Sequence, residues 1–154
     1  MQTPVDQVRD LLESEWKINW PAPLVKSLRE RSDSVALDWA FRCIRRLLDL
    51  SETPHRNQIK ADLEMLESWR LTLPESESLQ RKSEEIWYRP NRDDAQTALA
   101  HFCWDLARSL FPTSEEDVRW LYPTISLLTG SDRPIASLVG LCIEEYEASI
   151  TTGA

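Results

Sequence analysis

Glycine is scarce in this chain of 154 residues, which contains only Gly130, Gly140 and Gly153. Phosphate-binding loops and dinucleotide fingerprints need several closely spaced glycines, because their backbone turns tightly and approaches the phosphates. The three glycines fit neither pattern, so we expect no nucleotide-binding motif.

Cysteine and histidine are also few: the cysteines are Cys43, Cys103 and Cys142, and the histidines are His55 and His101. An odd number of widely spaced cysteines predicts neither a disulfide framework nor a paired-cysteine zinc site. The histidines form neither the HExxH motif nor the Glu-x-x-His pattern of di-iron bundles. All three cysteines lie on apolar helical stripes, where a thiol is a poor nucleophile. We therefore predict no catalytic residue, no metal and no cofactor, and thus a protein that is not an enzyme.

Positive charge is in deficit, because 18 basic residues face 26 acidic ones and the formal net charge is −8. This balance argues against binding to nucleic acid or to an anionic membrane. No apolar run reaches the roughly 18 residues of a membrane span, and no signal peptide is visible. We expect a soluble cytoplasmic protein, and the acidic surface permits a basic protein partner.

Nine prolines punctuate the chain, and most of them lie at the edges of segments with helical periodicity. The first helix is predicted to begin at Thr3. Further helices are predicted over 23–31, 35–50, 53–71, 74–89, 92–111, 114–129 and the segment after 131. Pro123 falls inside a pattern, so we expect a kink near Tyr122. No segment alternates as a strand does. The prediction is an all-α, single-domain bundle of about seven or eight short helices over residues 1–150, with a flexible tail at 151–154.

The helix expected over 35–50 is apolar around most of its circumference, which is typical of the central helix of a bundle. Its arginines, Arg42 and Arg45 among them, have Asp38 and Asp49 one turn away and are predicted to pair with them. The other acidic residues, including Asp62, are expected mainly on solvated helix surfaces. The pattern of residues 36–48 recurs at 98–110, either from two related halves or by chance.

One face of the helix expected over 92–111 is polar and lies opposite its apolar stripe. On this face Asp105 is one turn from His101, and Arg108 is one turn from Trp104, so an ion pair and a cation–π contact are within reach. The face is either a partner-binding patch, an acid/base pair or an ordinary solvated surface.

The chain has seven tryptophans, more than a core of this size needs. Trp20 and Trp87 lie beside prolines at segment edges, and Trp104 lies off its apolar stripe. Such residues either wedge helix ends together or anchor an interface. The candidate binding residues are Trp20, Trp87, His101, Trp104, Asp105 and Arg108.

The stretch from Trp39 to Leu48 (WAFRCIRRLL), followed by Arg56, Ile59 and the segment 67–69 (ESW), resembles small helical immunity proteins of bacterial polymorphic-toxin systems. The Ala/His-rich helix expected of that family is matched loosely by residues 95–107. The resemblance implies a cytoplasmic protein that binds and blocks a toxin, and it carries over no binding residue.

Together these observations predict a non-enzymatic protein-binding domain, with immunity-like inhibition of a basic toxin as its activity. The alternative is a structural or scaffold domain that acts as a homodimer or adaptor. An enzyme or ligand carrier would require a deep polar pocket around His101.

Overall fold

The computed structural model describes residues 2–72, 76–109 and 134–152 of the chain. Within these ranges it contains seven α-helices, one short 3-10 helix and no strand. The predicted all-α bundle is therefore confirmed. The helix predicted over 114–129, with its kink near Pro123, lies outside the described residues.

The first helix begins where the sequence predicts it, because a capping box closes its amino end. In α1 (Pro4–Leu12), the Thr3 hydroxyl accepts a hydrogen bond from the Asp6 backbone N–H at 3.1 Å, and the Asp6 carboxylate accepts one from the Thr3 N–H at 3.3 Å. These bonds satisfy backbone donors that the helix itself leaves unpaired. The chain continues through η1 (Lys17–Asn19) to α2 (Ala22–Arg29).

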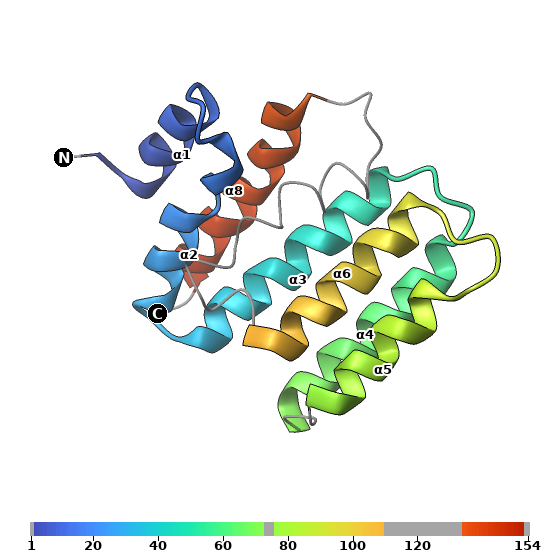
Figure 1. Cartoon of the computed structure of the whole chain (residues 1–154). Helices are drawn as coiled ribbons and strands as arrows, with labels where there is room; N and C mark the ends of the chain where they lie inside the picture. Colours follow the sequence, from blue (N-terminus) through green and yellow to red (C-terminus); the bar gives the residue numbers. More distant parts are fainter. Residues whose placement is uncertain (1, 73–75, 110–133, 153–154) are drawn as a thin grey trace.

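The central helix is α3 (Asp33–Leu50), whose amino end is capped by the Ser32 hydroxyl. Figure 1 shows it in the middle of the molecule, with α6 (Asp94–Ser109) running beside it. Phe41 and Phe102 join the two helices in an edge-to-face contact with ring centroids 5.3 Å apart. The wide apolar arc of α3 is buried as its pattern predicts, since the following residues are all in the core: Ala36, Trp39, Ala40, Phe41, Cys43, Ile44, Leu47 and Leu48.

The last helix, α8 (Ile135–Thr152), packs against both α3 and α2. The Trp39 indole donates a hydrogen bond to the Cys142 carbonyl at 2.9 Å, and the Ser27 and Tyr146 hydroxyls are hydrogen-bonded at 2.7 Å. Because α8 continues to Thr152, the helix includes the first two residues of the predicted tail.

The arginines of α3 pair with carboxylates on other helices. The pairs are Arg42–Glu145 at 3.1 Å, Arg46–Glu144 at 2.8 Å and Arg45–Glu67. The sequence predicted partners one turn away on the same helix and missed these contacts between helices. The ion pairs therefore join α3 to α8 and to α4 (Arg56–Thr72).

The chain reverses direction between α5 (Ser76–Trp87) and α6, which pack closely together. Asn91 has a φ of 58°, a left-handed conformation that asparagine tolerates better than most residues. Its carbonyl lies 3.0 Å from His55 Nε2, and the Asp93 carboxylate accepts a hydrogen bond from the Gln96 N–H at 3.0 Å at the start of α6. This fixed turn places the carboxyl end of α5 beside α6.

Candidate functional site

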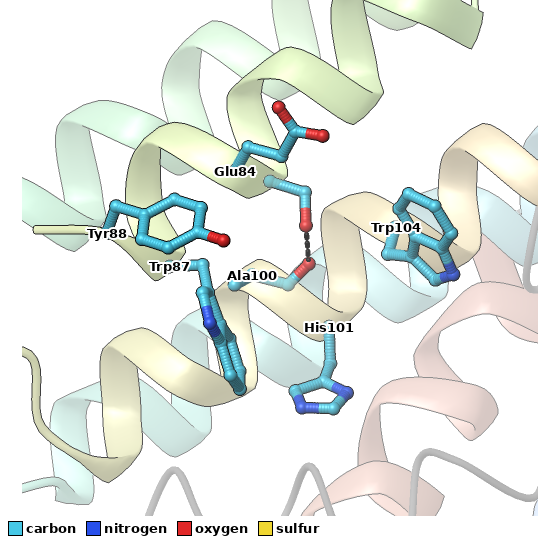
Figure 2. A pocket seen from close by; sticks show the side chains of 7 residues that line it. Glu84, Trp87, Tyr88, Ala100, His101 and Trp104 are labelled. Carbon is cyan, nitrogen blue, oxygen red and sulfur yellow. Dashed lines mark hydrogen bonds between the residues drawn. The ribbon is translucent and has the colours of Figure 1, made fainter.

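A pocket of about 220 Å³ opens between α5 and α6. The residues that line it belong to α5, to α6 and to the turn directly after α5: Ser83, Glu84, Trp87, Tyr88, Ala100, His101 and Trp104. Figure 2 shows the Trp87 and Tyr88 rings on one side and the Trp104 ring on the other, with Ala100 between them. We call this set of residues the aromatic pocket.

Helical spacing explains why these side chains converge. Glu84 precedes Trp87 and Tyr88 by three and four residues, and Ala100 precedes Trp104 by four. Residues three or four apart lie on the same side of a helix. Each helix thus contributes one short face to the aromatic pocket, and the turn at 88–93 brings the two faces together.

The aromatic rings of the pocket remain accessible to solvent. Trp87 is 41% exposed, Trp104 is 42% exposed and Tyr88 is 80% exposed. Most large aromatic side chains of a folded chain are better covered than this, whereas tryptophan and tyrosine are enriched at protein interfaces. The accessible rings make the aromatic pocket a candidate surface for recognition.

Trp87 is held in place by its neighbours. The Arg92 guanidinium carbon lies 3.7 Å from the centroid of the Trp87 ring, and Arg92 Nη1 donates to the Trp87 carbonyl at 2.7 Å. The His101 ring meets Trp87 edge to face, with centroids 5.8 Å apart and planes at 72°. These contacts orient the indole before any partner arrives.

One hydrogen bond lies at the base of the aromatic pocket. Ser83 donates a hydrogen bond of 2.7 Å to the Ala100 carbonyl, which ties α5 to α6 at the base of the pocket (Figure 2). The exposed Glu84 carboxylate stands at the edge. The described lining therefore offers the rings of Trp87, Tyr88, His101 and Trp104 and one carboxylate, with no arginine or lysine.

The structure brings three of the predicted site residues together, namely Trp87, His101 and Trp104. Trp20 is fully buried, so it belongs to the core and its predicted role as an exposed anchor is excluded in this structure. Asp105 and Arg108 lie on α6, and their side chains are outside the described part of the chain. The predicted His101–Asp105 and Trp104–Arg108 contacts thus stay predictions.

Sequence reasoning missed Tyr88, Glu84 and Arg92. The first two could have been found, because Tyr88 lies one turn from Glu84 and directly follows Trp87. Arg92 could not, since its place over the Trp87 ring depends on the chain reversal at Asn91. An arginine over a tryptophan, the kind of contact predicted for Trp104 and Arg108, is thus found at Trp87 and Arg92, and the Trp104–Arg108 contact stays a prediction.

A second cluster of charges lies between α4 and α5, where Asp62 is buried rather than solvated as predicted. Its carboxylate contacts Lys82 Nζ at 2.9 Å and the Arg89 guanidinium at 2.6 and 3.1 Å. Burial by itself would raise the Asp62 pKa, but the hydrogen bonds and charges of Arg89 and Lys82 outweigh it and hold the pKa below its usual value. Close pairing of this kind is typical of charged side chains that hold helices together, so we assign Asp62, Lys82 and Arg89 a structural role.

The cysteine thiols are unsuited to nucleophilic chemistry. All three are free and buried. Burial raises the pKa of Cys103 to about 12, and burial together with a hydrogen bond to Cys142 raises the pKa of Cys43 well above its usual range. Such thiols stay protonated at neutral pH, whereas the thiolate is the nucleophile.

Two further findings concern metals and membranes. Within the described ranges, no three side chains of histidine, cysteine, aspartate or glutamate come close enough to hold a metal ion. In the same part of the chain, no helix combines the length and the apolar character that crossing a membrane requires.

Comparison with protein-family models, with curated proteins and with solved structures gave no match. The resemblance to immunity proteins therefore stays a prediction.

Proposed function

We propose that this chain is a non-enzymatic cytoplasmic protein that binds a protein partner through the aromatic pocket. The observation that carries this proposal is the convergence of three accessible aromatic rings, Trp87, Tyr88 and Trp104, at one pocket. Tryptophan and tyrosine supply large contact areas with little loss of side-chain entropy, and they dominate the binding energy of many interfaces.

The properties of other groups support a binding role over catalysis. The raised pKa values of Cys43 and Cys103 keep these buried thiols protonated, and the buried charges between α4 and α5 are paired with one another. The Trp87 ring at the surface, by contrast, is oriented by Arg92 and His101 but only partly covered. Orientation before binding reduces the entropy lost on association.

The partner we propose is a basic toxin, which the chain would block as an immunity protein does. The formal net charge of −8 favours attraction to a positively charged protein. The resemblance of the segment from Trp39 to Trp69 to immunity proteins suggests the same partner class. A homodimer is the competing assignment for this surface.

Affinity capture from the cells that produce the chain tests this proposal. We expect the wild-type chain to capture one basic protein that arrests growth when expressed alone, and coexpression of the chain to restore growth. Trp104→Ala should weaken this binding by about 2 kcal/mol or more, roughly thirtyfold in Kd, because an interface tryptophan is lost.

Trp16→Ala is the matched control, since Trp16 is also exposed but lies outside the aromatic pocket. It should bind the partner as the wild type does. Equal binding by Trp104→Ala and wild type would refute the proposed surface. Recovery of only a second copy, with sedimentation that depends on concentration and on Trp104, would assign the surface to a homodimer instead.

A further inference from the structure

We infer that the aromatic pocket binds a cationic side chain, arginine or lysine, which the basic partner inserts between the rings of Trp87 and Trp104 with its charge toward Glu84. This inference rests on the proposed function and specifies what the partner must present. It follows from the charge, the ring chemistry and the size of the pocket.

The carboxylate of Glu84 supplies the negative charge. Other carboxylates of α5 are already paired, since Glu85 contacts Lys82 at 3.3 Å and Arg89 at 3.1 Å and Glu77 contacts Arg81. Among the residues that the structure describes, no cation pairs with Glu84. An apolar ligand would cover this carboxylate without compensating it, whereas a cation would be attracted to it.

The rings supply the second attraction. Aromatic faces carry partial negative charge and bind guanidinium and ammonium groups, with tryptophan the strongest. Trp87 already makes one such contact, because the Arg92 guanidinium lies 3.7 Å from its ring centroid. The same chemistry is available at Trp104, which lines the pocket from the other side (Figure 2).

An anionic ligand fits less well. The Ser83 hydroxyl donates to the Ala100 carbonyl and so is not available to an anion. The described lining contains no lysine or arginine to hold a carboxylate or phosphate. Arg92, which stacks on the Trp87 ring, also donates to the Trp87 carbonyl and is thus engaged within the chain. These features favour a cation over an anion.

The size of the pocket limits what can enter. Its volume of about 220 Å³ lies below the range of about 300 to 1,000 Å³ that is typical of sites for drug-sized ligands. A pocket of this size suits the end of one side chain presented by a larger partner.

The test is a titration of the full chain, labelled with ¹⁵N, with N-acetyl-arginine amide at constant ionic strength. Indole N–H signals are assigned with Trp87→Phe and Trp104→Phe. We expect both signals to shift saturably, with a Kd on the order of 1 to 10 mM for so small a probe. N-acetyl-citrulline amide, which has the same shape without the charge, should bind at least about fivefold more weakly.

Glu84→Gln should weaken binding of the arginine probe by about threefold to fivefold, as expected for one exposed charge pair. Glu77→Gln, which changes an exposed carboxylate on the same helix outside the pocket, should leave the Kd unchanged. The inference is overturned if citrulline binds as tightly as arginine, if Glu84→Gln has no effect, or if no saturation appears by roughly 50 mM.

This outcome is separable from that of the proposed function. If Trp104→Ala abolishes partner capture but Glu84→Gln does not, the aromatic pocket binds the partner without recognising a cation. If neither substitution affects capture of the partner, the proposed docking surface itself is wrong.

Discussion

The Asp62→Asn substitution removes a buried negative charge that two cations share across the contact between α4 and α5. The side chains of Asp62 and Lys82 are only 5% and 6% exposed, so neither charge has much solvent to replace its partner. Arg89 completes the cluster with two hydrogen bonds to the same carboxylate, at 2.6 and 3.1 Å. Asparagine keeps the shape of the side chain but leaves both cations without a buried counter-charge.

The expected loss of stability follows from this geometry. Removing one partner of a buried ion pair costs about 3 to 5 kcal/mol. Glu85 still contacts both cations, but it is 59% exposed, so its remaining pairs offset only about 1 kcal/mol of that cost. We therefore expect Asp62→Asn to lower the free energy of unfolding by about 2 to 4 kcal/mol, a large part of the stability of a typical domain.

Urea unfolding followed by tryptophan fluorescence measures this change. The midpoint should fall while the m-value stays the same, because the surface exposed on unfolding is unchanged. Glu85→Gln is the matched control, and its cost should stay below about 1 kcal/mol. Adding Lys82→Met to Asp62→Asn removes one of the cations that has lost its buried counter-charge and should recover about 1 kcal/mol or more.

The pH dependence provides a second readout. Because the folded-state pKa of Asp62 is lowered, its carboxylate stabilises the fold above its unfolded pKa of about 3.9. That stabilisation is lost as the pH falls through the folded pKa. The gap in stability between wild type and Asp62→Asn should therefore narrow on acidification. A cost below about 1 kcal/mol at pH 7, or a gap that does not change with pH, would refute this reasoning.

Two further predictions concern the core. Trp39→Phe removes the indole that donates a hydrogen bond to the Cys142 carbonyl at 2.9 Å. This change should lower the free energy of unfolding by about 1 to 3 kcal/mol in the same urea assay. No change would mean that this bond does not hold α8 on α3. The native chain should react very slowly with Ellman's reagent at pH 8, because the cysteines are buried and the pKa of Cys103 is raised to about 12. The chain unfolded in urea should react fully. Rapid labelling of the native chain would contradict the burial of the cysteines.

Much of the fold could be predicted because helical stripes and caps are local. Thr3 and Asp6 form their capping box within one turn, and the apolar arc of α3 marks that helix for burial wherever its neighbours lie. Periodicity could even have predicted the burial of Asp62, which lies on the same face of α4 as Ile59 and Leu66. The prediction for Asp62 was wrong because the acidic residues were expected mainly on solvated helix surfaces.

What the sequence could not predict depends on how helices are placed against one another. The carboxylate partners of Arg42 and Arg45 come from α8 and α4, far along the chain. Trp20 directly precedes Pro21 and Trp87 lies three residues before Pro90, yet the Trp20 side chain faces the core and the Trp87 side chain is partly exposed to solvent. No local pattern distinguishes these two directions.

The most direct test of the aromatic pocket as the binding surface is the indole N–H spectrum of the ¹⁵N-labelled chain, recorded with and without the captured partner. We predict that the signals of Trp87 and Trp104 shift or broaden on binding, while that of the exposed Trp16 stays unchanged. Unchanged signals from Trp87 and Trp104 in a saturated complex would show that the partner binds elsewhere.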